Sequence, residues 1–173
     1  MASLRGSLLI LLAVALCALA EFPATPAASR DLRAPRRAAG FVVRGRVWCD
    51  NCRAGFETPA STYIAGAKVR VECKSKTTGE KTCSFDGHTD RTGTYNILVA
   101  DEHEHELCET VLVSSPDMAC AKTVAGRERA PVFLTSNNGV ESNIRLANAL
   151  GFQKDVALSE CSQLLRMYEE DRD

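Results

Sequence analysis

The stretch KVRVECK at residues 68–74 indicates the fold class, because its polarity alternates at every position. Val69, Val71 and Cys73 form an apolar row, and the residues between and around them are Lys, Arg or Glu. Successive side chains of a β-strand point to opposite faces, so a period of two predicts a strand with one buried face.

Six further runs with the character of short strands lie on either side of this one. In one of them Tyr95, Ile97 and Val99 share a face, and residues 90–93 form a turn before it. An Asn-Gly pair within residues 136–139 predicts a β-hairpin, because both residues accept a positive φ. The seven expected strands cover residues 41–48, 68–74, 81–89, 94–100, 109–114, 130–135 and 140–147. They predict an all-β fold, a seven-stranded antiparallel β-sandwich or barrel.

The C-terminal segment has a different period. Ala157, Cys161, Leu164, Leu165 and Tyr168 recur at the spacing of one helix face. The pattern predicts a short amphipathic C-terminal helix with Cys161 on its buried side.

The first 40 residues have the character of a leader and a linker. Residues 1–20 combine Arg5, an apolar run and a small-x-small site ending at Ala20. This pattern predicts a cleaved secretory signal peptide rather than a membrane anchor. Residues 21–40 are rich in Pro, Ala and Arg and predict a disordered lead-in before a β domain at 41–173. We therefore expect an extracellular, secreted protein with no membrane insertion.

The charge balance argues against nucleic acid as a partner. Loss of Arg5 with the leader leaves 20 basic and 22 acidic residues, a formal charge of −2. A chain that binds the phosphate backbone normally carries a basic surplus.

Seven cysteines remain once Cys17 leaves with the leader, and the oxidising secretory route favours their pairing. An odd number leaves at least one unpaired within the chain, and the sequence alone cannot choose among the pairings. Cys49 and Cys52 form a C-x-x-C, which can be a redox pair or half of a zinc site. No second ligand pair follows at zinc spacing, so we favour structural cysteines that each pair elsewhere.

The run DEHEHE at residues 101–106 is the strongest candidate for a metal site. If the run were extended, His103, His105 and Asp101 would share one face and supply at most three ligands. We favour a solvated acidic loop, and we expect neither a metal nor a cofactor. His88 is isolated, and no nucleophile signature is present, so we expect no catalytic residues.

Several segments resemble proteins of the pollen Ole e I allergen and extensin family, including its grass pollen members. FVVRGRVWCDNCRAGFET, from residue 41, resembles the first strand of the family with its cysteine pair. Further matches follow in the order of the family and extend the resemblance over residues 41–168. They are IAGAKVRVEC, HTDRTGTY, LVSSPDMAC, PVFLTSNNGV and IRLANALGF.

The resemblance implies a secreted β-protein with disulfides Cys49–Cys120, Cys52–Cys161 and Cys73–Cys108. Cys83 is additional to the six cysteines of the family, and the lead-in is longer than we expect for a member. Cys83 is then a free thiol or the link of an intermolecular dimer of an otherwise monomeric protein.

The resemblance also implies a role outside the cell without catalysis. We expect an interaction module that presents loops on a rigid scaffold to an extracellular protein, a peptide or a cell-wall polymer, in the context of pollen or pollen tube growth. The alternative is an extracellular protease inhibitor, with Arg127 or Arg129 as its basic contact residue, or a hydrolase. The sequence does not identify the partner.

Overall fold

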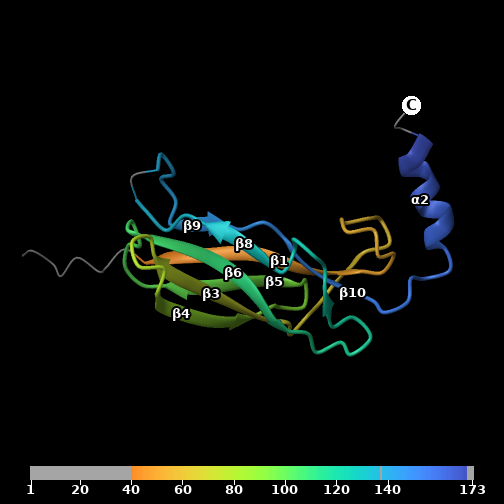
Figure 1. The fold of residues 1–173 in the computed structure, drawn as a ribbon, viewed down its shortest axis with the longest axis horizontal. Coiled ribbons are helices and arrows are strands. Elements are labelled where there is room, and N and C mark those ends of the chain that lie inside the picture. The colour runs from red at the N-terminus through yellow and green to blue at the C-terminus, as the bar shows by residue number, and fades with distance from the viewer. Residues whose placement is uncertain (1–39, 137, 171–173) are drawn as a thin grey trace, which may run out of the picture. The chain divides into compact units, whose positions relative to one another are not determined.

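The computed structural model describes residues 40–136 and 138–170, and within them the chain forms two β-sheets and a C-terminal helix (Figure 1). The elements, in chain order, are β1 (Phe41–Asp50), β2 (Thr62–Tyr63), β3 (Lys68–Ser75), β4 (Lys81–His88), β5 (Thr94–Val99), β6 (Glu106–Ser114), β7 (Lys122–Thr123), β8 (Arg129–Val132), β9 (Ile144–Leu146), β10 (Leu150–Gln153) and α2 (Cys161–Glu170).

One sheet is an antiparallel arrangement in the order β4-β3-β6-β8. The other is built around β1. The first part of β1 lies between β5, which is antiparallel to it, and β9, which is parallel. Its last residues pair with β2 and β10, and β7 extends the sheet beyond β10. The all-β fold class with two sheets and a short C-terminal helix is thus confirmed, and the two parallel pairings of β1 are a detail the sequence did not indicate.

The core lies between the two sheets. The inward rows predicted for β3 and β5 are buried, with Val69, Val71, Tyr95 and Val99 all fully inaccessible to solvent. A Cβ at Gly45 would overlap the Tyr95 ring, so only glycine lets this large side chain lie under β1. This close packing of a single apolar face per strand explains why the alternation in the sequence is so regular.

The expected strands are present with changes in their ends, the largest at residues 140–147, where β9 covers only Ile144–Leu146, and three short strands were missed. β2, β7 and β10 contain two to four residues each, too few to establish a period of two. Their positions depend on the edges that β1 and β10 offer, which are created only when the chain folds.

The predicted hairpin at residues 136–139 is wrong. Gly139 has a positive φ of 80°, and the Val140 N–H donates to Asn138 Oδ1, so a local turn does form. The flanking strands do not pair with each other, because β8 joins β6 in one sheet and β9 joins β1 in the other. The segment therefore crosses between the sheets.

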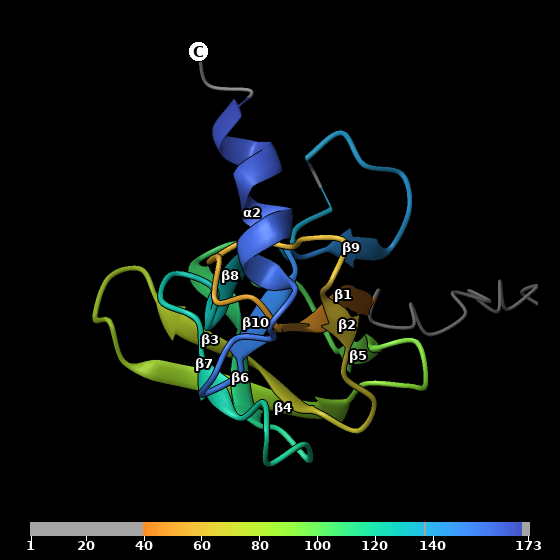
Figure 2. The same cartoon turned by 90° about the vertical axis from the view of Figure 1, so that its right-hand side faces the viewer.

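The helix α2 begins at Cys161, and Figure 2 shows it rising from the end of the domain where β10 lies. Cys161 is buried, as predicted, and Tyr168 contacts Phe56 edge to face with ring centroids 5.2 Å apart. The disulfide of Cys161 to Cys52 and the contact of Tyr168 with Phe56 thus attach the helix to the loop after β1 near both of its ends.

The expected signal peptide and most of the lead-in concern residues 1–39, which lie outside the described residues, and both stay predictions. β1 starts at Phe41, where the sequence placed the start of the β domain. No helix among the described residues has the length and apolar character required to cross a bilayer.

Candidate functional site

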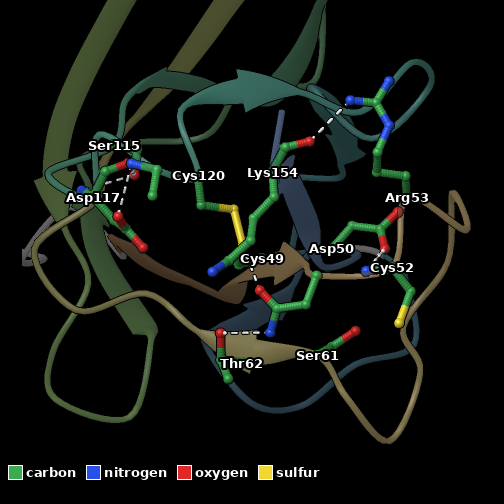
Figure 3. The surroundings of a disulfide bond; sticks show 12 residues. Cys49, Asp50, Cys52, Arg53, Ser61, Thr62, Ser115, Asp117, Cys120 and Lys154 are labelled. Atoms are coloured by element: carbon green, nitrogen blue, oxygen red, sulfur yellow. Dashed lines mark hydrogen bonds between the residues drawn. A yellow bond between two sulfur atoms is a disulfide. The ribbon is translucent and has the colours of Figure 1, made fainter. Parts of the chain in front are cut away.

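The C-x-x-C cysteines at the end of β1 each pair with a distant part of the chain. Cys49 bonds to Cys120, which precedes β7 (Figure 3), and Cys52 bonds to Cys161 at the start of α2. Both bridges are buried. A redox pair would need the two sulfurs reduced or bonded to each other, and a zinc site would need both as thiolates. Each sulfur is instead bonded to a distant cysteine, so the motif joins the first strand to later segments.

The residues between and after these cysteines extend the same anchoring with hydrogen bonds. The buried Asp50 carboxylate accepts from the backbone N–H groups of Cys52 at 3.2 Å and Gly55 at 2.7 Å. Asn51 Nδ2 donates to the Ala60 carbonyl at 2.6 Å. The Arg53 guanidinium donates to the carbonyl of Lys154, as Figure 3 shows, and to that of Asp155. The Cys-Asp-x-Cys-Arg sequence is therefore a structural junction.

The third bridge, Cys73–Cys108, joins directly opposed residues of β3 and β6, with Cα atoms 4.1 Å apart. The three bridges in the structure are the pairs that the family resemblance implies. Cys83, on the other side of β3 from Cys108, faces Cys73 across the β3–β4 pair and is not bonded to any other cysteine of the described residues.

The acidic and histidine-rich run does not lie in one extended strand. It forms the loop between β5 and β6, with Asp101 in a left-handed conformation at a φ of 64°. Asp101 and His105 are exposed, as a solvated loop requires. His103 instead turns inward, its side chain is only 9% exposed, and it contacts Glu106.

His103 and Glu106 lie beside Cys83. The Cys83 sulfur is 3.8 Å from His103 Nδ1 and 4.0 Å from Glu106 Oε2. Burial first, and the negative charge of Glu106 second, raise the pKa of the Cys83 thiol. The sequence did not indicate this cluster, because Cys83 is on β4 and His103 lies 20 residues later, in the loop between β5 and β6. His88 is exposed at the end of β4 and takes no part in it.

A broad groove of about 620 Å³ runs across the solvent-facing side of β5, β1 and β9. Arg44 and Arg46, two positions apart on β1, project into it beside Thr94 and Asn96 of β5. On the β9 side Leu146, which is 77% exposed, provides an apolar wall. The alternation in FVVRGRV places both arginines on one face, so the sequence contained this signal, but we had not interpreted it as a site.

Neither arginine of the groove forms an ion pair with a carboxylate of the described residues. Arg44 Nε donates to Asn96 Oδ1 at 2.7 Å, and the Arg46 guanidinium lies 3.5 Å from the centre of the Tyr63 ring. The partners in these two contacts are neutral, and Arg46 also interacts at longer range with the charge of Asp90. The guanidinium N–H groups that these contacts leave unused can bind an anion.

Asp90 is a carboxylate at the rim of the groove, and one of its two oxygens is already occupied. Its Oδ1 accepts from the backbone N–H groups of Thr92 and Thr94 and from the Thr92 hydroxyl. These hydrogen bonds, those of Thr92 first, hold the pKa of Asp90 below its ordinary value. It is therefore a weak base and a structural residue of the turn.

Arg127 and Arg129, the two arginines considered for protease inhibition, do not lie on a protruding loop with a free backbone. Arg129 lies within β8 and forms an ion pair with Glu109 at 2.7 Å. The backbone of Arg127 is bonded at both groups, its N–H to Val124 and its carbonyl to the N–H of Gly151. A substrate-like inhibitor needs a protruding loop whose backbone is free to pair with the protease, and neither position offers it.

Comparison with known proteins shows the same relationship over the whole folded region. A profile of the family described as "Pollen protein Ole e 1 like" matches residues 39–169. Pollen-specific protein C13 of Zea mays is 50% identical over 133 residues, which cover 77% of this chain and 78% of that protein. Pollen allergen Phl p 11 of Phleum pratense is 45% identical, over 75% of this chain and 92% of the allergen.

A solved structure agrees with the sequence relatives. The crystal structure of the major plantain pollen allergen Pla l 1 superimposes with a TM-score of 0.62 at 29% identity. The match covers 70% of this chain and 99% of that one. Because the family profile, the curated relatives and the solved fold coincide over the domain, this chain belongs to the Pollen protein Ole e 1 like family.

Proposed function

We propose that this protein is a secreted, non-enzymatic binding module of pollen that uses the groove of Arg44 and Arg46 to hold a carboxylate-bearing cell-wall polysaccharide. The relatives named above are a pollen-specific protein and a pollen allergen. Its three disulfides are typical of proteins that leave the cell, where the redox conditions preserve them.

The unpaired guanidinium groups of the groove are the observation that carries the proposal. Residues two apart on a strand lie about 6.6 Å from each other on one face, so Arg44 and Arg46 offer two regularly spaced cations. A guanidinium binds a carboxylate through two parallel hydrogen bonds. A polymer with a carboxylate on successive sugars presents repeated anions to such a pair.

The rest of the groove suits a sugar better than an acidic peptide. Asn96 and Thr94 provide side-chain amide and hydroxyl groups, which can exchange hydrogen bonds with sugar hydroxyls. Leu146 gives an exposed apolar surface against which the C–H face of a sugar ring can pack. The groove is open and crosses three strands, so an extended polysaccharide can lie along it with both of its ends outside the site.

The same groove gives no support to catalysis. Among the described residues Asp90 is the one carboxylate lining it, and its hydrogen bonds to Thr92 and Thr94, which lower its pKa, leave it poorly suited to accept a proton. Arginines remain protonated and serve as donors rather than as bases. Binding without turnover is the role this set of side chains fits.

Binding of oligogalacturonides by isothermal titration calorimetry tests the proposal, with Arg44→Ala/Arg46→Ala as the key variant. A charge-assisted hydrogen bond contributes about 1.5 kcal/mol or more, so loss of both guanidiniums should weaken binding about 100-fold or more. The matched control, Lys122→Ala/Arg166→Ala, removes the same charge from two other exposed positions and should change affinity little.

Two further measurements separate the proposed ligand from other anions. Methyl-esterified oligomers, which lack the carboxylates, should not bind, and added salt should weaken the binding of the acidic ones. Equal losses in the two double variants would show a nonspecific effect of net charge. Preference for an acidic peptide of equal charge over the oligogalacturonide would also reject the sugar as ligand.

A further inference from the structure

We propose that Cys83, His103 and Glu106 form a zinc site on the sheet opposite to the arginine groove. Cys83 comes from β4, His103 from the loop before β6, and Glu106 is the first residue of β6. This inference departs from our expectation from the sequence that no metal is bound, and it is independent of the proposed binding of polysaccharide.

The distances between the three ligand atoms are close to those of a tetrahedral site. Zinc bonds of about 2.3 Å to sulfur and 2.0–2.1 Å to nitrogen and oxygen place ligand atoms about 3.3–3.6 Å apart. The observed separations are 3.8 Å for Cys83 Sγ to His103 Nδ1 and 4.0 Å for Cys83 Sγ to Glu106 Oε2. The third, His103 Nδ1 to Glu106 Oε2, is 2.5 Å and must open by somewhat less than 1 Å.

The hydrogen bonds of the His103 ring orient it as a ligand. Its Nε2 lies 3.0 Å from the Ala100 carbonyl, which can only accept, so Nε2 carries a proton and points away from the cluster. A ligating histidine characteristically donates its second ring N–H to a carbonyl or carboxylate, which fixes the ring. Nδ1 is thereby directed at Glu106 and Cys83.

The kinds of donor atom in the cluster indicate which metal ion fits it. Zinc would bind these side chains as thiolate, imidazole and carboxylate, and any proton that they carry would be released to solvent. Thiolate with imidazole favours zinc over magnesium or calcium, which prefer oxygen.

The fourth position is open. Cys73 lies beside the cluster, with its sulfur within 4.8 Å of the other ligand atoms, but it is bonded to Cys108 and is not a thiolate. Three protein ligands with water in the fourth position is the arrangement of open zinc sites, whereas closed structural sites have four protein ligands. Bound zinc would link β4, at the edge of its sheet, to the loop between β5 and β6.

Titration of the chelator-treated, disulfide-intact protein with Zn²⁺ and with Co²⁺ tests the proposal. We expect one metal ion per chain and, with Co²⁺, a sulfur-to-metal charge-transfer band. Loss of outer hydrogen-bond partners alone lowers metal affinity about 10- to 100-fold, so Cys83→Ser and His103→Gln should each lower it more than about 100-fold. His105→Gln is the matched control, because His105 is exposed in the same loop, and its affinity should equal that of the wild type.

One measurement needs no variant and so does not depend on the folding of altered chains. Zn²⁺ should protect Cys83 of the wild-type protein from iodoacetamide, and a chelator should restore labelling. Absence of stoichiometric binding, a Co²⁺ complex without the sulfur band, or binding equally lost in His105→Gln would overturn the zinc site.

Discussion

Replacement of Gly93 by alanine should destabilise the domain much more than the same replacement at Gly79. Both glycines have a φ of 72°, where an L-residue other than glycine costs about 1–2 kcal/mol. Both substitutions also restrict the unfolded chain in the same way, so that contribution cancels between them. The two positions differ only in what a new methyl group would meet.

At Gly79 a Cβ would have no heavy atom within 4 Å. At Gly93 it would lie 2.6 Å from Tyr63 Cβ and 2.9 Å from the Val47 carbonyl oxygen. The Gly93 carbonyl also accepts the Val47 N–H at 2.8 Å, so the turn cannot easily move away from β1. Overpacking of this kind costs about 1–3 kcal/mol, which gives about 2–5 kcal/mol for Gly93→Ala and about 1–2 kcal/mol for Gly79→Ala.

Thermal and urea unfolding followed by circular dichroism, with all disulfides intact, measures the difference. At roughly 4 °C per kcal/mol for a domain of this size, Gly93→Ala should melt about 4–12 °C below Gly79→Ala. The substitution should also weaken ligand binding, because Asp90 and Thr94 of the same turn line the arginine groove. Equal losses of stability in the two variants would refute the argument from steric overlap.

Two further outcomes can be measured on the same protein. The guanidinium of Arg70, and then the ammonium of Lys68, hold the pKa of Asp86 well below its ordinary value. The Asp86 carboxylate therefore stabilises the fold at pH values above about 4, and this contribution is lost as the pH falls further. Asp86→Asn should therefore flatten the dependence of the urea midpoint on pH below about pH 4, and an unchanged slope would contradict the assignment. Non-reducing peptide mapping after iodoacetamide treatment should find the label on Cys83 alone among the described cysteines, whereas a Cys73–Cys83 bridge would show that the free thiol lies elsewhere.

The failed hairpin and the cluster at Cys83 show where local sequence stops being informative. Asn138 and Gly139 do form a turn, but the turn does not specify which strands its flanking segments join. β9 joins β1 in parallel, with Ile144 opposite Val42 and Leu146 opposite Arg44. This pairing joins residues far apart in the chain, so no local signal specifies it. In the same way, His103 appeared to belong to a solvated loop, and only the packing of that loop over β4 brought it to Cys83.

The sequence by itself determined the strands of the core, the turn before β5, the buried face of the C-terminal helix and, through resemblance, the family. These features are local or are repeated along one element, so a period of two, a period of 3.6 or a short motif is enough to reveal them. Only the tertiary structure decided which sheet each strand enters, that β1 has parallel neighbours, that Arg44 and Arg46 share a groove, and that Cys83 meets His103 and Glu106. These features depend on the pairing of residues far apart in the chain, which is set by the packing of one apolar layer on another rather than by any single segment.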